Sequence, residues 1–457
     1  MKNLKFEREL NSLIYYVREY GIHRVNINED DIKKNKDNRH AFISSVHKGF
    51  NLAQQNVIAC LRKILLEQKQ VKLNIKKANV EKSKSDKAKL NEQLHKLKYQ
   101  EHVLRRIIDS IAWQMLQYDL TSIRRLYHSH SLIDITDSNI ESCIRASEKI
   151  ANDNPLHFAL INDISSFIQV GDLTLCKYGE SISFIELKEG IVNEKVYKVL
   201  DSFVENKCER FLYYSLLNEG DKFKEQFMRN IKQIKSSNDT IHSINTGEGF
   251  SPHYGVNVTT FQGTLELDNF EAEMIELINI CKKKNYAISV IEGCLLVGVY
   301  NTQKFPSNVF DYWVKDLEIE TPIYDLRQNF FDPFAYPIFL HNFHTKDLID
   351  IVSGRMVIKM TIDIKAWLST FEKEGYEYRW MTAKETARSN SKANRNAKIF
   401  TINKRGIEIK KGAFSVALGG GLFIRMFTRF NTPSSIKQYL IETGKHIAAN
   451  ENNNIGN

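Results

Sequence analysis

More than a hundred consecutive residues lack both glycine and proline, and this stretch most limits what the chain can fold into. It lies between Gly49 and Pro155. Because glycine and proline interrupt helices more strongly than other residues, a stretch this long without them is typical of a largely helical segment. We therefore predict that residues 1–130 form a helical N-terminal domain.

Apolar residues recur within this stretch at alternating spacings of four and three. The series is Leu90, Leu94, Leu97, Leu104, Ile108, Ile111 and Met115, with Glu101 at the one skipped position. This is the a/d pattern of a coiled coil over about four heptads. An earlier apolar series runs toward Gln70, and the lysine-rich stretch between the two is expected to be a helix tip or a turn. The pattern predicts a long antiparallel helical hairpin from about 45 to 120, whose lysines form a solvated face rather than a nucleic-acid contact.

An apolar seam of this length has to be covered, either by its own return helix or by another subunit. We therefore expect a homodimer, or a complex with a partner protein, through residues 45–120.

The composition is that of a globular protein, and its charge suits an anionic partner. Hydrophobic residues make up 42% and charged residues 26%, which excludes wholesale disorder. The formal net charge is +9, a basic excess that fits nucleic acid but is shared by many unrelated proteins. The first residues lack the apolar stretch of a signal peptide, no apolar run is long enough to span a bilayer, and the six cysteines form no Cys-x-x-Cys pair. We expect a soluble, reduced, cytoplasmic protein with no membrane contact.

The part of the chain after residue 155 has a different distribution of glycines and apolar residues. From residue 155 onward glycines return, and short apolar runs at 173–176, 182–187 and 287–300 alternate with helical patterns such as 194–217. Strands that alternate with helices predict an α/β unit over about 140–300. For 301–457 we predict an α+β domain with strands at 356–362, 398–403, 406–410 and 413–417. The expected fold class is thus α/β, with a helical hairpin before this unit and an α+β domain after it.

The strongest local signal for chemistry is GDLTLCKYGESISFIELKEG, residues 171–190. Two apolar runs flank a short connection that contains glycine, as in a β-hairpin or a near-adjacent strand pair. The side-chain period of two puts Phe184, Glu186 and Lys188 on one face of the second strand. A charge at the end of an otherwise buried strand needs a partner. A hard metal cation is one such partner, and Asp172 supplies the second carboxylate that it needs.

Asp172, Glu186 and Lys188 resemble the motif of the restriction-endonuclease-like PD-(D/E)XK nuclease superfamily, over part of the chain. The resemblance implies a core of a mixed sheet flanked by helices. It implies that Asp172 and Glu186 hold Mg²⁺, for which Mn²⁺ substitutes, with the Leu187 carbonyl as a further ligand. Lys188 would then position and deprotonate the attacking water, or stabilise charge at the phosphorus. Gly171 stands where the family name has proline. The surrounding sequence resembles that of bacterial anti-phage defence proteins.

Other interpretations of the motif stay open. Glu67–Lys69 and Glu205–Lys207 have the same Glu-x-Lys form in helical patterns, where residues i and i+2 face apart. Glu408–Lys410 is strand-like and competes more seriously, but it lacks a nearby upstream acid. The plainer alternative for Glu186–Lys188 is an exposed strand end with a local ion pair.

Several residues are candidates for supporting roles. The resemblance implies an upstream acid, for which Glu148 and Asp163 are the candidates. It also implies a polar helix after the second strand. In KFKEQFMRNIKQIK an apolar stripe (Phe223, Phe227, Ile231 and Ile234) would face the sheet, so that Gln226 and Arg229 line the active site or hold phosphate. An ordinary amphipathic helix is the alternative.

The basic segment 382–398 is a candidate nucleic-acid-binding loop. Its Arg388, Lys392, Arg395 and Lys398 either contact phosphates or form an ordinary solvated loop. The histidine pairs His128/His130 and His341/His344 have no third ligand at a recognisable spacing, so we predict structural or surface roles for them.

The sequence therefore predicts a Mg²⁺-dependent nuclease that hydrolyses phosphodiesters, with DNA rather than RNA as the expected substrate. The alternatives are a catalytically degenerate nucleic-acid-binding protein and a scaffold that acts with a partner.

Overall fold

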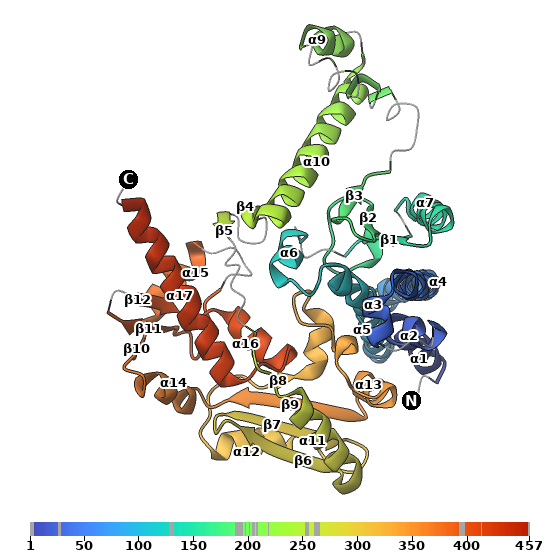
Figure 1. Cartoon of the computed structure of the whole chain (residues 1–457). Helices are drawn as coiled ribbons and strands as arrows, with labels where there is room; N and C mark the ends of the chain where they lie inside the picture. Colours follow the sequence, from blue (N-terminus) through green and yellow to red (C-terminus); the bar gives the residue numbers. More distant parts are fainter. Residues whose placement is uncertain are drawn as a thin grey trace.

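The computed structural model describes residues 4–25, 29–127, 132–136, 138–187, 195–196, 198–200, 202, 206, 209–217, 219–251, 256–259, 266–392, 398–412 and 414–455 (Figure 1). The fold is mixed α/β, with long helices and small sheets. Every strand pair among the described residues is antiparallel, so the mixed sheet that the resemblance implies is not present in them. No helix within these ranges combines the length and hydropathy that crossing a bilayer requires.

The N-terminal part is helical and is dominated by two long antiparallel helices. Its elements are α1 (Leu4–Arg18), α2 (Tyr20–Val25), α3 (Glu29–Lys34), α4 (Lys36–Val80), α5 (Lys84–Met115) and α6 (Leu120–Arg125). The Asn35 side chain caps α4 by accepting the backbone N–H groups of Asp37 and Asn38. At the other end, Lys82 adopts a φ of +55° in the short turn that leads back into α5. The helical hairpin expected from the heptads is therefore present.

The same chain covers the apolar seam of α5. Leu104, Ile108 and Ile111 are fully buried in a cluster that includes residues of α4 and α1. Glu101, at the skipped heptad position, is buried as well and accepts hydrogen bonds from Gln68 and Arg105. The seam thus does not require a second subunit to cover it.

A small sheet follows the hairpin. It consists of β1 (His157–Ile161), β2 (Leu173–Lys177) and β3 (Ser183–Ile185), all antiparallel in that order, with α7 (Ile140–Asp153) before β1 and η1 (Asn162–Ile164) after it. The predicted hairpin at 173–187 is confirmed, with Gly179 in the turn at a φ of +81°. The second strand is shorter than expected, because regular pairing ends at Ile185.

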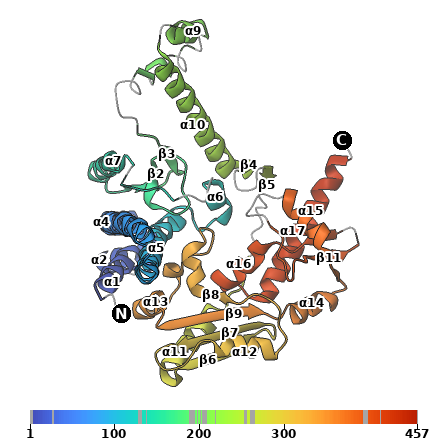
Figure 2. The ribbon, with the colours of Figure 1, turned by 180° about the vertical axis from the view of Figure 1, so that it is seen from behind.

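Helix α10 leads away from this sheet, and α9 lies at its far end (Figures 1 and 2). The bounds here are α9 (Glu209–Leu217), α10 (Asp221–Thr246), β4 (Glu248–Ser251) and β5 (Val256–Thr259). Phe223 and Phe227 pack with Val196 and Leu200 in a separate apolar cluster. The expectation that this stripe faces the sheet is therefore wrong, because another helical segment of the chain covers it.

The four-stranded sheet draws its strands from both sides of residue 300. Its order is β6-β7-β9-β8, built from β6 (Tyr286–Ile291), β7 (Leu295–Asn301), β8 (Tyr324–Asp325) and β9 (Met356–Ile362), together with α11 (Glu271–Lys284), α12 (Val309–Asp316), η2 (Leu326–Phe331), η3 (Ile338–Leu340) and α13 (Thr345–Val352). The run 287–300, expected in the same unit as 171–190, pairs with Met356–Ile362 instead. The physical reason is that β7 is buried, so the backbone N–H and C=O groups at both of its edges need partners, which β6 and β9 supply.

The C-terminal part completes the fold with α14 (Ile364–Glu372), β10 (Glu377–Trp380), α15 (Ala383–Lys392), β11 (Ile407–Lys411), β12 (Phe414–Ala417), α16 (Gly420–Thr428) and α17 (Pro433–Ile455). The strands expected at 356–362, 406–410 and 413–417 are present. The one expected at 398–403 is reduced to isolated bridges at Ile399 and Ile402.

The basic segment 382–398 is not a loop over its first part. Residues 383–392 form α15, because Thr382 and Glu385 exchange the two hydrogen bonds of a capping box. One continuous apolar core, from Phe6 to Ile441, joins the N-terminal helices, the four-stranded sheet, the two three-stranded sheets and the C-terminal helices.

Candidate active site

Three acidic residues lie beside the ends of three adjacent strands. Asp163 follows the end of β1, Asp172 precedes the start of β2, and Glu186 follows the end of β3. The antiparallel register pairs Ile161 with Leu173 and Leu173 with Ile185. All three acids are therefore placed at one edge of the sheet, which we call the acidic edge.

Hydrogen bonds from Asp172 hold both neighbours of Glu186. The backbone N–H of Asp172 donates to the Ile185 carbonyl at 2.9 Å, and the Asp172 carboxylate accepts the Leu187 N–H at 2.5 Å. Glu186 is thus fixed between two residues that are both tied to β2. Asp172 also accepts the backbone N–H of Asn162 at its carbonyl, at 3.0 Å, which links it to the end of β1.

Gly171 explains why the residue before the aspartate is not proline. Its φ is +68°, and a Cβ built on it would lie 3.1 Å from the Ile185 carbonyl oxygen. Proline is locked near a φ of −65°, so it cannot adopt this conformation. The tight turn into the acidic edge therefore needs glycine.

The pKa of the Asp163 carboxyl group is raised. Burial is the largest cause, a hydrogen bond with the Ser138 side chain and the charge of Arg105 oppose it, and the Glu186 carboxylate adds to the rise. A carboxylate that is both desolvated and beside a second carboxylate is stabilised in its charged form by a cation. This is the electrostatic setting that a divalent metal ion relieves.

The long hairpin positions the loop that carries Asp163. The fully buried Arg105 donates to the carbonyl oxygens of Asp163 at 2.7 Å and Ile133 at 2.6 Å, and its Nε bonds Glu101 at 3.1 Å. One turn later, Asp109 accepts hydrogen bonds from the Ser165 hydroxyl at 2.7 Å and from Arg106 at 2.9 Å. The loop after β1 is thereby fixed to α5 through buried ionic groups.

Helix α4 holds the outer side of β1. The Gln54 side chain donates to the Ala159 carbonyl at 3.2 Å and accepts the Ile161 N–H at 2.8 Å. β1 is an end strand of the sheet, so this amide takes the place of a neighbouring strand. The roles of Gln54, Arg105 and Asp109 were not predicted from the sequence. The available sign was that each is a polar residue within or beside an otherwise apolar helical pattern.

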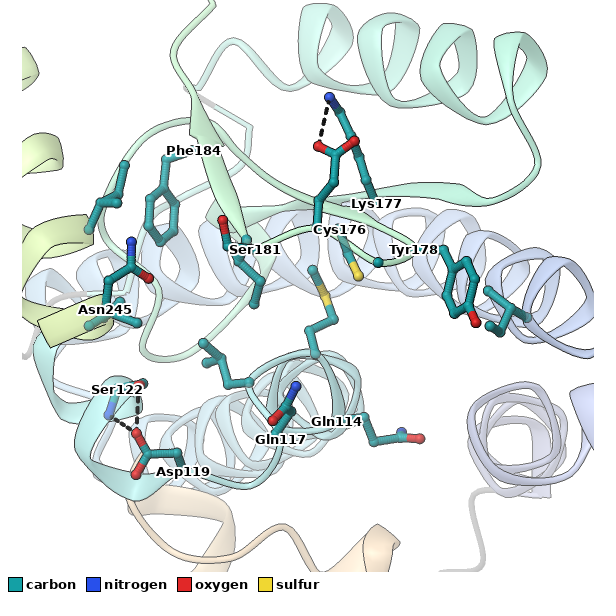
Figure 3. A pocket seen from close by; sticks show the side chains of 18 of the residues that line it. Gln114, Gln117, Asp119, Ser122, Cys176, Lys177, Tyr178, Ser181, Phe184 and Asn245 are labelled. Carbon is teal, nitrogen blue, oxygen red and sulfur yellow. Dashed lines mark hydrogen bonds and ion pairs between the residues drawn. The ribbon is translucent and has the colours of Figure 1, made fainter. Parts of the chain in front are cut away.

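A cavity of about 840 Å³ lies beside the β2–β3 turn (Figure 3). It is lined by the β2–β3 turn, the end of α5, the start of α6 and the C-terminal end of α10. Ile182 and Phe184 line it, and Glu186 follows them at the two-residue period of β3. The cavity lies at the β2–β3 turn, at the opposite end of these strands from the acidic edge, and none of the three acids is among its lining residues.

Two of the proposed supporting residues lie away from the acidic edge. Glu148 is exposed on α7 and accepts a hydrogen bond from Gln55; it shares a groove with His157, at the opposite end of β1. Gln226 is half-buried and Arg229 is exposed. The part of α10 that faces the sheet begins at Ile241, 15 residues or about 22 Å of helix after Gln226. Of the two upstream acids, only Asp163 is placed beside Glu186.

The remaining predicted residues are accounted for as follows. Lys188, Arg395, His128 and His130 lie outside the described residues, as does the side chain of Lys392. Arg388 and Lys398 are exposed on either side of the gap at 393–397.

The other motifs have structural roles. His341 is buried between Glu271 and the Thr428 carbonyl, and His344 caps α13. Glu408 of the competing triplet contacts Arg379, Lys410 and Ser415 in a local network. Across the described ranges, no group of three or more His, Cys, Asp or Glu side chains is arranged to hold a metal ion.

Comparisons with known proteins found no match: no family model, no curated protein and no solved structure is similar to this chain.

Proposed function

We propose that this chain is a Mg²⁺-dependent nuclease with a restriction-endonuclease-like core, and that it cleaves phosphodiesters, of DNA rather than RNA, at the acidic edge. The observation that carries the proposal is the register of β1, β2 and β3, which places Asp163, Asp172 and Glu186 at one end of the sheet. The raised pKa of Asp163, caused by burial and by Glu186, supports a cation at this position.

Each residue has a defined role in this proposal. Asp172 and Glu186 would hold the metal, with the Leu187 carbonyl as a further ligand, and Asp163 would join them only if the acidic edge closes around the ion. A metal held there would supply a water of lowered pKa and positive charge beside the phosphorus. Lys188, two residues after Glu186, positions that water and takes up its proton, or stabilises the developing charge.

Cleavage assays test the proposal directly. The purified protein is incubated with plasmid DNA, single-stranded DNA and RNA in Mg²⁺, Mn²⁺ or EDTA. We expect metal-dependent cleavage that Asp172→Asn or Glu186→Gln reduces at least about 100-fold, as for other groups that stabilise a transition state. Lys188→Met should do the same while the protein still binds nucleic acid.

The competing triplet provides the matched control. Lys410→Met should leave cleavage unchanged, because Glu408 and Lys410 belong to a local ion-pair network on β11. If Lys410→Met abolished cleavage and Lys188→Met did not, the site would be on the other strand. Binding without cleavage in every metal would instead favour the degenerate nucleic-acid-binding protein.

We also propose a contact with a second copy or a partner protein through α4. Leu66, Leu73 and Val80 are exposed on this helix at intervals of seven residues, so they form one stripe. Light scattering at micromolar concentration tests this contact. Association that survives replacement of all three residues by serine would contradict it.

A further inference from the structure

The distal part of the helical hairpin extends past the last hydrogen bonds that tie it to the body. On α4 the last such contact is the ion pair of Lys69 with Asp134 at 3.3 Å. On α5 it is the Tyr99 hydroxyl, which donates to the Val352 carbonyl at 2.8 Å. Between these points lie residues 70–98, which we call the arm. Some of its apolar residues, such as Val71, Ala78 and Leu97, are buried, whereas Leu73 and Val80 are exposed.

The arm carries most of the net charge of the protein. Its 29 residues include nine lysines and three acidic residues, a net charge of +6 out of +9 for the whole chain. All nine lysines are exposed: Lys72, Lys76, Lys77, Lys82, Lys84, Lys87, Lys89, Lys96 and Lys98.

The acidic residues of the arm neutralise little of this charge. Glu92 pairs with Lys96 at 2.6 Å, and this hydrogen bond lowers the pKa of the Glu92 carboxyl. Asp86 accepts the Ser83 hydroxyl at the start of α5. Among the described residues, the other eight lysines form no ion pair with a carboxylate. Like charges one turn apart, such as Lys72 and Lys76, repel each other. When a polyanion binds, its phosphates neutralise the lysines and its condensed counterions are released into the solvent, so the repulsion between the lysines is removed.

The arm is joined rigidly to the acidic edge. Lys98 precedes Arg105 by seven residues, about 10 Å along α5, and Arg105 bonds the Asp163 carbonyl. Lys84, at the tip, is 21 residues or about 32 Å away. At about 3.4 Å per base pair, this length corresponds to roughly nine base pairs of duplex.

We propose that the arm binds the phosphate backbone of duplex nucleic acid that extends away from the acidic edge. The position of the cleaved bond relative to the arm rests on the proposed function, whereas binding by the arm does not. The composition of the arm surface favours binding to a polyanion rather than to a lipid bilayer. Lysines occupy the outer surface of both helices, and Leu73 and Val80 form too narrow an apolar face to lie in a membrane surface. The substrate class is thus a duplex with at least about nine base pairs on one side of the cleaved bond.

Neutralising four arm lysines tests the proposal. Lys76, Lys77, Lys84 and Lys87 are replaced together by glutamine in the full chain. The matched control replaces Lys283, Lys284, Lys304 and Lys315, which are equally exposed but lie near the four-stranded sheet. Both variants lower the net charge by four. Affinity for a 30-base-pair duplex is measured in EDTA, so that cleavage does not interfere.

The arm variant should bind the duplex at least about 10-fold more weakly at 100 mM salt. Its slope of log affinity against log salt should fall by about 0.9 for each phosphate that the arm no longer neutralises. The control should differ from the parent less than twofold. Circular dichroism should show unchanged helicity, because all eight lysines are exposed.

Three results would overturn the proposal: unchanged binding by the arm variant, an equal loss in both variants, or binding of the arm to phosphatidylserine vesicles and not to duplex. The two proposals fail separately. A parent protein that binds through the arm but cleaves nothing in any metal contradicts only the nuclease. If the parent protein cleaves DNA and the arm variant binds and cleaves it equally well, only the proposal that the arm binds the duplex is contradicted.

Discussion

Among single residues, Gly171 has the greatest effect on the path of the chain into the acidic edge. Gly171→Ala should destabilise the protein by about 1–2 kcal/mol, the cost of placing a side chain at positive φ. The new Cβ would also press on the Ile185 carbonyl. Gly171→Pro should cost more, although it restores the proline of the nuclease family name. Chemical denaturation measures both changes.

Gly179→Ala is the control for this prediction. Gly179 also has a positive φ, of +81°, but a Cβ there meets nothing within 4 Å. The two alanine variants therefore share the conformational cost and differ in the contact with Ile185. Equal destabilisation by both would show that the contact contributes nothing.

Asp163 should make the protein less stable as the pH rises. The pKa of its carboxyl group is higher in the folded chain than in the unfolded chain, chiefly because it is buried. The folded state therefore holds the proton more tightly, and stability falls as pH rises from the ordinary pKa of aspartate through the raised value. Asp163→Asn should remove this loss. Measured in EDTA, the variant should be more stable than the parent at pH 7 and no different at low pH.

The same substitution should reduce metal-dependent cleavage at least about 100-fold if Asp163 is a ligand. Glu148→Gln is the matched control, because Glu148 is exposed and accepts a hydrogen bond from Gln55, away from the acidic edge. It should change neither the pH profile nor the rate. A stable, fully active Asp163→Asn would remove Asp163 from the site and leave Asp172 and Glu186.

At the scale of one element, α5 both fills the core and anchors the site. Asp109→Leu would leave the buried Arg106 guanidinium without its carboxylate, at a cost of about 3–5 kcal/mol. The double variant Arg106→Met, Asp109→Leu should be less destabilised than the single one, because no charge remains buried alone. Urea unfolding of both singles and the double measures the coupling. Additive effects would mean that the pair does not act as a unit.

Helix α5 also shows what periodicity can and cannot predict. The heptads predicted the hairpin, because each apolar position needs cover and α4 is adjacent in sequence. The skipped position at Glu101 indicated a polar contact but not its partners, since Gln68 and Arg105 become neighbours only in the fold. In α10 the same reasoning found the apolar stripe and chose the wrong partner for it. Thr382 and Glu385 have the three-residue spacing of a capping box, which is a sequence signal for the start of a helix. The prediction of a loop rested on the basic composition and did not use this spacing.

At the scale of the whole molecule, two basic surfaces are separated along the chain: the arm and the segment around α15. Neutralising Arg388, Lys392, Arg395 and Lys398 together should weaken binding to all sequences alike and flatten its salt dependence. Combined with the arm variant, the reductions in log affinity should add, because the two surfaces bind different phosphates. Titrations at several salt concentrations measure each slope. An unchanged slope would make the α15 segment an ordinary solvated surface.

Which distant strands pair with each other could not be predicted from local sequence patterns. The sequence located β2, β3 and β9 as strands and showed β6 and β7 as one apolar run at 287–300, and the motif in 171–190 located the acidic edge. That β7 pairs with β9 follows from burial on both faces of β7, which becomes visible only when the surrounding helices are placed. For the same reason the acids Asp172 and Glu186 were found, while the buried groups of α5 that hold the loop with Asp163 were not.

The pairing of β7 with β9 also sets an order of events during synthesis. The central strand Leu295–Asn301 leaves the ribosome about sixty residues before Met356–Ile362, its second neighbour. Until then, one edge of a highly apolar strand is open to other chains. The Trp367 indole N–H of α14, the helix that follows β9, donates a hydrogen bond to the Pro433 carbonyl at the start of α17. This contact next to the sheet therefore forms only after the last helix has been synthesised. A nascent chain of this protein is therefore exposed to aggregation while the residues between β7 and β9 are being synthesised, and we expect its yield to depend on chaperones that bind unfolded segments.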